Sequence, residues 1–300
     1  MTEETACNLC HSTRYKVLYQ RKSSPTIIKR KYRISEANLI PPERIVKCLD
    51  CGLIFANPRI HSHDIIAAYS DMEDDESYLK EEMGRRMAAH LLLKKIKKFK
   101  LQGNKLLDIG CSIGFFLDEA RKMGWNVSGV EISKWAVKYA KEKLSLTVHH
   151  ASLEDAKLPD NHFDVVIMQD TIEHLLNPRE TLLEIKRILK PGGIVYVNTP
   201  NIDSFVSRIL QAKWWGINQF HLYYFSNCTL GKLLANTGFH DFQFISHERT
   251  FSFRYWMERF ENYSKTIYGI LTFISKKMGF KNKLLRINLW DQIGIFARKI

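Results

Sequence analysis

The sequence predicts an α/β fold in which a mainly parallel sheet carries helices on both faces, with a small metal-binding unit in front of it. Three observations predict this arrangement. Strand-like and helix-like segments alternate from Leu101 onward, a glycine-rich turn joins a buried strand to a helix at 106–120, and four paired cysteines fall within residues 1–60. Strict alternation of strands and helices is typical of parallel sheets, because a helix usually makes each crossover.

The composition sets broad limits on the protein. Its 300 residues, 45% of them apolar, suit one large domain with a real core or one domain plus a small appendage. We find neither the pattern of a secretory signal nor an apolar run of about 18 residues, so we expect a cytoplasmic protein. The formal net charge of +13 favours an acidic partner such as nucleic acid or an anionic membrane, although lysines are also the ordinary solvated face of helices. Composition does not indicate an oligomeric state.

Residues 1–60 are expected to form a zinc-binding unit. Cys7 and Cys10 form one Cys-x-x-Cys pair, and Cys48 and Cys51 form a second. Each pair can direct two thiolates at one tetrahedral ion, so the four sulfurs predict structural Zn²⁺ with no position open to water. The basic segment between the pairs has little apolar material, so metal binding would supply stability, and we expect the following domain to have a separate core. The alternative is four cysteines placed in this spacing by chance.

Residues 61–100 are predicted to be helical, because apolar residues recur at helical spacing and Gly or Pro pairs are absent. The acidic run from Asp71 to Glu76 predicts a break at the surface. By its pattern alone, this helical segment fits a solvated linker.

The domain at 101–300 carries the alternating pattern. Strands are predicted at 105–109, 126–131, 146–150, 163–168 and 194–198, and helices at 115–123, 134–143, 178–189 and 228–236. Ligands of such sheets bind beyond the carboxyl ends of the strands. Two stretches of this domain, at 200–226 and 250–287, look like insertions.

The turn LLDIGCSIGFFLDEA predicts a nucleoside site. It places Asp108, Gly110 and Gly114 between a strand and a helix, and Glu131 closes the next strand 21 positions after Gly110. An acidic residue about that far past a glycine-rich turn is suited to bind a ribose, because one carboxylate can accept hydrogen bonds from both hydroxyls.

The Asp-x-Gly-x-x-x-Gly spacing departs from the Gly-x-Gly-x-x-Gly of dinucleotide enzymes and resembles motif I of the class I S-adenosylmethionine (SAM) methyltransferases. Further segments resemble the same family in the same order, namely ASLEDAKLPDNHFDVVIMQDTIEHLLNP and ILKPGGIVYVNTPN. The resemblance implies that Gly110 and Gly114 let the backbone approach the methionine part of SAM. It also implies that Ser152, Leu153 and Glu154 lie beside the adenine. The full set of implied cofactor residues is Asp108, Gly110, Cys111, Gly114, Glu131, Ser152, Leu153, Glu154 and Gln169.

The same resemblance implies the architecture. The fold would be a Rossmann-like, seven-stranded, mostly parallel sheet with its last two strands at 239–246 and 289–297, the final one antiparallel. The helical segment 61–100 would cover the cofactor, with Tyr69 or Tyr78 near its methionine end. The second cysteine pair, in CLDCGLIFANPR, also resembles the zinc-binding domain that precedes certain bacterial methyltransferases.

Candidate catalytic residues follow the fourth strand. Asp170, Glu173 and His174 stand at i, i+3 and i+4, so a helical turn would put them on one face, where they could share a proton or a divalent ion such as Mg²⁺ or Mn²⁺. A similar acidic-x-x-Glu-His arrangement in the ubiquinone-type O-methyltransferases is tied to metal. The alternative is that these residues only shape the loop and the cofactor rim. His221, in the aromatic segment AKWWGINQFHLYYFS, is a second candidate base or a packed histidine.

The insertion at 250–287 carries apolar residues at helical spacing together with several lysines. Such a helix can cap the substrate pocket or lie on an anionic membrane, and capping is our expectation. The apolar positions are Ile267, Ile270, Leu271, Ile274 and Met278.

Three functions fit the sequence. A SAM-dependent methyltransferase with a small-molecule acceptor, such as a sugar, a lipid-linked compound or a quinone-like compound, fits the aromatic loop and the capping insertion best. An RNA methyltransferase fits the basic charge and the zinc unit, although QDTI stands where an Asn-Pro-Pro-Tyr sequence would hold a flipped base. A non-catalytic SAM-binding module is the third, because the glycine turn by itself indicates only binding.

Overall fold

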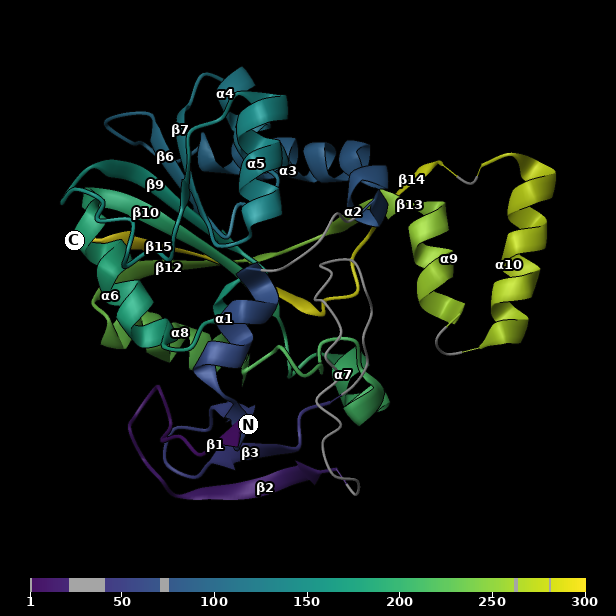
Figure 1. Ribbon diagram of the computed structural model, residues 1–300, viewed down its shortest axis with the longest axis horizontal. Coiled ribbons are helices and arrows are strands. Elements are labelled where there is room, and N and C mark those ends of the chain that lie inside the picture. Colours follow the sequence, from purple (N-terminus) through teal and green to yellow (C-terminus); the bar gives the residue numbers. More distant parts are fainter. Residues whose placement is uncertain (1, 22–40, 71–75, 262–263, 281) are drawn as a thin grey trace.

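A seven-stranded sheet forms the centre of the protein in a computed structural model that describes residues 2–21, 41–70, 76–261, 264–280 and 282–300. Its strand order is β12-β15-β10-β9-β6-β7-β8 (Figure 1). Only β15 runs antiparallel to its neighbours. This arrangement confirms the predicted fold class. The strands are β6 (Lys105–Ile109), β7 (Asn126–Glu131), β8 (Val148–His150), β9 (Phe163–Gln169), β10 (Leu189–Pro200), β12 (Phe239–Ser246) and β15 (Gln292–Lys299).

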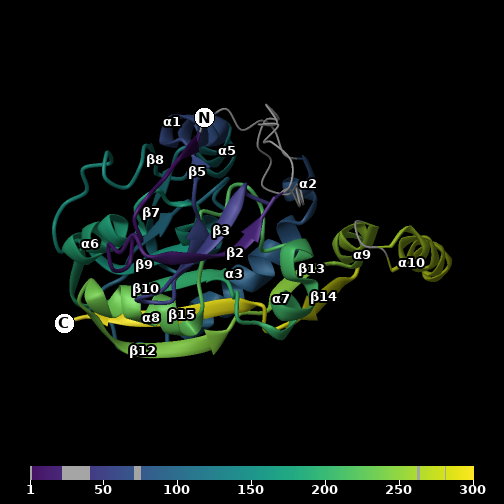
Figure 2. The ribbon, with the colours of Figure 1, turned by 90° about the horizontal axis from the view of Figure 1, so that it is seen from below.

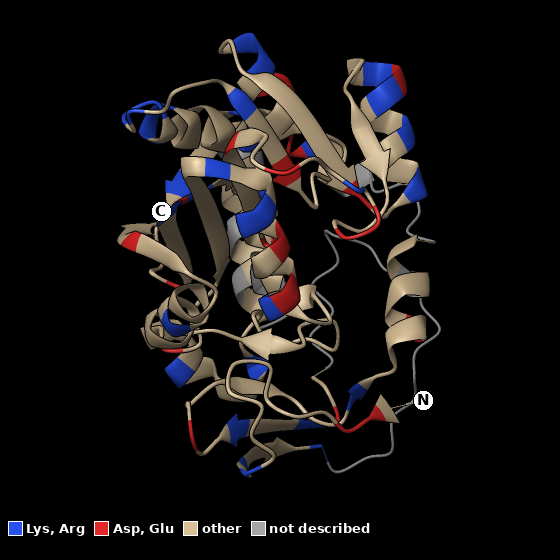
Figure 3. Cartoon of the chain, turned by 90° about the vertical axis from the view of Figure 1, so that its left-hand side faces the viewer, with Lys and Arg blue, Asp and Glu red and all other residues tan. Residues whose placement is uncertain are grey.

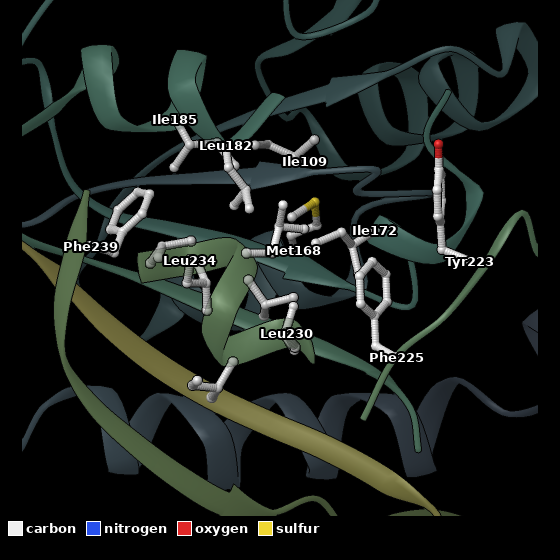
Figure 4. Close-up of a cluster of buried hydrophobic side chains, with 14 of the residues drawn as sticks. Ile109, Met168, Ile172, Leu182, Ile185, Tyr223, Phe225, Leu230, Leu234 and Phe239 are labelled. Atoms are coloured by element: carbon white, nitrogen blue, oxygen red, sulfur yellow. The ribbon is translucent and has the colours of Figure 1, made fainter. Parts of the chain in front are cut away.

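Helices cover both faces of this sheet, because successive strand residues point to opposite sides. Val165 and Ile167 pack with α3 (Glu82–Ile96), α4 (Phe115–Lys122) and α5 (Lys134–Leu144) in one buried cluster. Val166 and Met168 pack with α6 (Pro178–Ile188) and α8 (Asn227–Asn236) in another, part of which Figure 4 shows. Both faces of the central strands are therefore buried, which explains why they read as continuous apolar runs.

Several predicted elements agree with the structure to within a residue or two, including β6, β7 and β12. The last strand begins at Gln292, later than predicted, because Trp290 has a left-handed backbone (φ 52) and its N–H donates to Asn288 Oδ1, which makes a turn. The segment 61–100 is helical as predicted, with α1 (Ser62–Ser70), α2 (Glu76–Lys80) and α3. The acidic run at 71–75 lies outside the described residues.

The cysteine-rich segment forms a small sheet, the knuckle sheet, in the order β11-β4-β3-β2. Its first three strands in the chain are β2 (Tyr15–Gln20), β3 (Arg44–Cys48) and β4 (Ile54–Ala56), and β1 (Thr2–Glu3) pairs separately with β5 (Arg59–Ile60). The edge strand β11 (Tyr223–Tyr224) comes from the segment after β10, so the insertion at 200–226 joins the N-terminal unit.

The knuckle sheet does not have the separate core that we expected. Cys7, Val46 and Phe55 belong to the same buried cluster as Met168 and the inner residues of α6 and α8. Figure 4 shows the β11 segment reaching this cluster, with Tyr223 and Phe225 beside Ile172. The physical reason is size, because four short strands bury too little apolar surface alone and instead pack on the large domain.

The insertion at 250–287 has two parts. Its base is a two-stranded sheet of β13 (Arg249–Ser252) and β14 (Leu284–Ile287), held to α3 by Glu81, which accepts hydrogen bonds from Ser252 N (2.8 Å) and Ser252 Oγ (2.7 Å). Its distal part, α9 (Phe253–Glu261) and α10 (Lys265–Met278), extends away from the central sheet (Figures 1 and 2).

The capping expectation is wrong for α10, which stands apart from the sheet and leaves Ile270, Phe273 and Ile274 exposed. Among the described residues, no helix is long and apolar enough to cross a membrane. Contact of this hairpin with an anionic membrane, and the cytoplasmic location, stay predictions. The remaining short elements are α7 (Phe205–Leu210) and the 3₁₀ turns η1 (Ile172–His174) and η2 (Gln211–Lys213).

The shared core predicts how the protein unfolds. Phe55 on β4 is 2% exposed, so Phe55→Ala should lower the free energy of unfolding by about 3–5 kcal/mol and should destabilise the whole protein in one transition. Urea unfolding followed by circular dichroism and by tryptophan fluorescence measures this. Leu18→Ala, at a position 48% exposed on β2, is the control and should change little. Two separate transitions, with only the first shifted, would contradict a shared core.

Candidate functional site

One cavity of about 790 Å³ lies beyond the carboxyl ends of β6, β7, β9 and β10. Its wall combines the glycine turn, the loops after β8 and β9, helices α1 and α3, the aromatic segment 215–221 and the base of the insertion. Both Tyr69 on α1 and Tyr78 on α2 line it, and the expectation that this segment covers a cofactor stays a prediction. A volume of this size is typical of small-molecule sites.

The two glycines of the turn have different roles. Gly110 has φ 70 and lines the cavity, and a Cβ there would meet Thr171 Oγ1 at 2.6 Å. Gly114 has φ 88 and begins α4, but it does not line the cavity, and a Cβ there would meet Leu146 Cδ1 at 2.5 Å. The structure therefore places Gly114 in packing between the turn and β8, which differs from the cofactor contact that the sequence led us to expect.

Glu131 is fixed at the cavity wall by three backbone amides. Its Oε2 accepts from Ser112 N (2.8 Å), and its Oε1 accepts from Ile132 N (2.8 Å) and Ser133 N (2.9 Å). A carboxylate has about four lone-pair positions, so about one remains for a ligand, where we expected two. Burial raises the pKa of Glu131 against the effect of these amides. The pKa of Asp108 is raised by burial and then by the charge of Glu131.

These residues fit the adenosine and methionine parts of SAM. Ser112 Oγ is buried in the cavity wall and has no hydrogen-bond partner among the described residues, so it is available to a polar ligand beside Glu131. Glu154 Oε1 accepts from Thr181 Oγ1 (2.8 Å), and this bond connects the loop after β8 to α6. Of the implied cofactor residues, those on the cavity wall are Asp108, Gly110, Cys111, Glu131, Ser152, Leu153, Glu154 and Gln169.

At the other end of the cavity, Glu173, His174 and His221 bring their ligand atoms within 4.8 Å of one another. The two imidazole centroids are 4.6 Å apart and the rings are nearly perpendicular. Leu222 N donates to the carbonyl of Glu173 (2.8 Å), so the aromatic segment is tied directly to η1. From the sequence, Glu173 and His174 were candidates in one group and His221 was a separate candidate. The fold brings the three together.

Asp170 is not part of this group, so the single helical face expected for Asp170, Glu173 and His174 does not form. The reason is local: Asp170 has a left-handed backbone (φ 46) and precedes a 3₁₀ turn of three residues. Its carboxyl lines the cavity toward the positive charges of Arg249 and Arg85. Burial raises its pKa, and the two arginines oppose that rise.

Both histidines are neutral, and each has its Nδ1 beside a backbone carbonyl. His221 Nδ1 lies 2.8 Å from the carbonyl of Gly216, and His174 Nδ1 lies 3.0 Å from the carbonyl of Phe220 and 2.5 Å from Tyr69 Oη. Because a carbonyl only accepts, the proton of each ring is assigned to Nδ1, which leaves the Nε2 lone pair. Burial lowers the pKa of His174 to about 4 and that of His221 well below its usual value.

Glu173 is a buried acid with one unsatisfied oxygen. Its Oε2 accepts from Thr199 Oγ1 (2.9 Å), and its Oε1 has no hydrogen-bond partner in the described part of the chain. Burial, and then the charge of Asp170, raises its pKa well above the usual range. A group with two imidazoles and one such carboxyl can accept a proton or hold a divalent cation.

The four cysteines converge as predicted. The sulfurs of Cys7 and Cys51 are 3.4 Å apart, those of Cys10 and Cys48 are 3.5 Å apart, and all four lie within 4.8 Å. Four sulfurs at 2.3 Å from a tetrahedral Zn²⁺ would be about 3.8 Å apart, so the group fits that ion closely. None of the four lines the cavity, which agrees with a structural role.

Several cavity residues were not found from the sequence. Arg85 stood in a helical segment read only as a lid, and the others follow β12 or start β15, where no motif marks them. The only sequence signal for them was the expectation that the insertion at 250–287 caps the pocket, and residues at the base of this insertion do line the cavity. These residues are Arg85, His247, Arg249, Phe251, Tyr255 and Gln292.

A sequence profile described as "Methyltransferase domain" matches residues 79–243, more than half of the chain. The ubiquinone biosynthesis O-methyltransferase of Cereibacter sphaeroides is 32% identical over 120 residues, which cover 38% of this chain and 49% of that protein. A probable S-adenosylmethionine-dependent methyltransferase of Mycolicibacterium smegmatis is 29% identical over 138 residues, 46% of this chain and 52% of that protein. The chain thus spans about half the length of the curated relatives it matches.

Solved structures share the fold. The crystal structure of a SAM-dependent methyltransferase from Archaeoglobus fulgidus superimposes with a TM-score of 0.51 and 23% identity. The match covers 75% of this chain and 100% of that one, so the fold is shared over the whole of the smaller protein.

Proposed function

The chain belongs to the methyltransferase-domain family, as its glycine turn and following segments predict, and we propose that it is a class I SAM-dependent methyltransferase with a small-molecule acceptor. The observation that carries this proposal is one cavity whose wall includes both the nucleoside-binding turn, here called its cofactor end, and the Glu173, His174 and His221 group, here called its acceptor end. Methyl transfer is an in-line displacement, in which the acceptor atom, the methyl carbon and the sulfur lie on one line. The cofactor and the acceptor must therefore be held in one enclosed space.

At the cofactor end, Glu131 would accept from a ribose hydroxyl and Ser112 Oγ would meet a second polar group. Leu153, 3% exposed, would provide an apolar face for the adenine. SAM supplies a methyl group on a positively charged sulfur, and the residues of this chain would hold and orient it. Burial raises the pKa of the Asp108 carboxyl, and a bound cation would favour its ionised form.

At the acceptor end, a neutral imidazole is suited to take the proton of a hydroxyl or amine as the methyl group arrives. Phe220 and Tyr69 pack edge-on with centroids 6.0 Å apart, and Tyr69 packs on His174 at 5.6 Å, so the group is walled by aromatic rings. These walls exclude water and favour a planar aromatic acceptor. We therefore propose a quinone-like phenol ahead of a sugar or a lipid-linked compound, in line with the named relatives.

An RNA acceptor is the alternative to a small-molecule acceptor. Figure 3 shows Lys and Arg on many separate helices and strands. A basic stripe along one face is the usual footprint of nucleic-acid binding, so this distribution favours a small acceptor. Purified protein incubated with labelled SAM and with separate RNA and metabolite pools distinguishes the two.

We further propose that the Glu173, His174 and His221 group can hold a divalent ion. The structure replaces Asp170 by His221 in the donor set, which gives two nitrogens and one oxygen. This set suits Mn²⁺ better than Mg²⁺, because imidazole is a poor ligand for magnesium.

The four cysteines are proposed to hold one structural Zn²⁺. Arg179 N donates to Asn8 Oδ1 (2.9 Å), and Arg59 donates to the carbonyl of Leu176 (2.8 Å), so the unit is attached to the loop after η1. Zinc in this position would stabilise the knuckle sheet and, through it, the acceptor end of the cavity.

Glu131→Gln should weaken SAM binding about tenfold or less, and Glu131→Ala should weaken it more. The amide keeps one oxygen acceptor, whereas alanine also releases the amides of Ser112, Ile132 and Ser133, and a hydrogen bond to a charged group is worth about 1.5–3 kcal/mol. Isothermal titration with SAM measures both. Glu142→Gln, on the outer side of α5, is the control. Native affinity in Glu131→Ala would refute the assignment of the turn.

His174→Ala and His221→Gln should lower turnover by about 10²–10⁴-fold if either imidazole is the base, with SAM affinity nearly unchanged. Rates with a catechol as the test acceptor, measured beside SAM affinity, check this. His149→Ala on β8 is the control, because that residue does not line the cavity. If a divalent ion is needed, EDTA should abolish activity and Mn²⁺ should restore it. Native turnover in both histidine variants would mean that alignment alone drives the reaction.

Protein purified without added metal should contain one zinc per chain by elemental analysis. Cys48→Ser should lose the metal and lower the melting temperature of the whole protein, because Cys48 lies in the shared core. Cys228→Ser, at an exposed cysteine outside the group, should change neither. Full zinc occupancy in Cys48→Ser would rule out the four-thiolate site. A native melting temperature after loss of zinc would rule out its link to the large domain.

A further inference from the structure

Arg85 on α3 differs from the other arginines around it. Its guanidinium lines the cavity, and it forms no ion pair or hydrogen bond with any residue that the structure describes. Its Nε is buried and has no partner. The three arginines nearby are all paired, Arg86 with Glu82 and Asp118, Arg249 with Asp291, and Arg254 with Glu81.

Aromatic rings hold this arginine in place. The central carbon of the Arg85 guanidinium lies 3.6 Å from the centroid of the Tyr78 ring and 5.3 Å from that of Phe251. Tyr78 in turn stacks on Phe115, the first residue of α4, at 6.2 Å and 21°. Stacking attracts the cation to the ring faces but does not use its N–H donors, which lie in the guanidinium plane. Arg85 is thus fixed beside the glycine turn with its donors unused.

The backbone around Arg85 is also fixed. Gly84, the residue before Arg85, packs so closely on β13 that a Cβ would collide with the carbonyl of Thr250. Glu81, one turn earlier, is bound by Ser252 and Arg254. The junction of α3 with the base of the insertion therefore sets the backbone position from which the Arg85 side chain reaches the cavity.

The acids that face Arg85 do not neutralise it in a pair. The charge of Arg85 acts on the buried carboxyl of Asp170 across the cavity, without an ion pair between them. Asp291 forms an ion pair with Arg249 (Oδ2 to Nη2, 3.0 Å), and Glu248 forms one with Arg286. A cavity wall with one fixed, unpaired guanidinium is suited to an anion of matching planar geometry.

We propose that Arg85 is the carboxylate-binding residue of this cavity, with Tyr78 and Phe251 as its aromatic clamp. The guanidinium presents two parallel N–H donors, and a carboxylate presents two acceptors at the same spacing. Two ligands of the proposed reaction can bring that group, namely the amino-acid end of SAM and an acceptor that is itself an acid. The inference rests on the proposed function, because both ligands occupy this cavity.

Binding measurements separate the two sources. Arg85→Gln, Arg85→Lys and the native protein are titrated with S-adenosylhomocysteine and with methylthioadenosine, which lacks the amino-acid end. They are then saturated with S-adenosylhomocysteine and titrated with 3,4-dihydroxybenzoate and with its neutral amide. Arg86→Gln is the matched control, because the neighbouring guanidinium already pairs with Glu82 and Asp118. Thermal unfolding confirms that each variant is folded.

If Arg85 binds the cofactor carboxylate, Arg85→Gln lowers the affinity for S-adenosylhomocysteine at least tenfold. It leaves the affinity for methylthioadenosine within twofold of the native value. If Arg85 binds an acidic acceptor, the native protein binds the benzoate at least tenfold more tightly than the amide. Arg85→Gln then loses that preference, while its affinity for S-adenosylhomocysteine is unchanged. Arg85→Lys should retain part of either effect, because it keeps the charge without the paired donors.

Native affinities for all four probes in Arg85→Gln would overturn the proposal. So would an equal loss for methylthioadenosine and S-adenosylhomocysteine, because that result indicates a structural role. Failure of the native protein to bind S-adenosylhomocysteine would instead refute the proposed function, and the inference with it.

Discussion

The arrangement of the acceptor end depends on one constraint, which is that the knuckle sheet and the central sheet share a single apolar core. Cys7 and Phe55 pack in the same cluster as Met168, although they lie far from it in the chain. A short backbone ladder crosses this junction, because Leu222 donates to the carbonyl of Glu173 and accepts from Ala56 N (2.9 Å). His221 stands next to Leu222, so its position against His174 follows from the docking of the small sheet.

Burial also determines the charge state of the cavity. Asp108, Glu131, Asp170 and Glu173 all lose solvation, which raises their pKa values, while His174 and His221 become neutral for the same reason. A positively charged ligand would favour the ionised acids, and its conversion to a neutral product would remove that attraction. The proposed reaction converts a sulfonium into a neutral thioether, so these acids would favour the substrate cofactor over the product.

The sequence predicts the cofactor end better than the acceptor end for a physical reason. The strands β6, β7 and β9 are buried on both faces and therefore read as apolar runs, and the turn between β6 and α4 is contiguous in the chain. Asp170 was misplaced because its left-handed backbone interrupts the helical spacing, and a sequence does not show which of its aspartates adopts that conformation. Gly114 was assigned to the ligand because a motif records that glycine is needed there, but not whether a ligand or Leu146 requires it.

Arg85 shows the limit of sequence reasoning most clearly. In the sequence it is one of 45 basic residues, and only tertiary contacts distinguish it from Arg86, whose side chain is paired on the other side of the same helix turn. The acceptor end is assembled from α1, α3, the aromatic segment and β13, which are far apart in the chain. Its chemistry depends on how these segments pack, whereas the chemistry of the cofactor end is largely local. A change in docking of the knuckle sheet or the insertion base would therefore alter which acceptor fits while leaving the glycine turn intact.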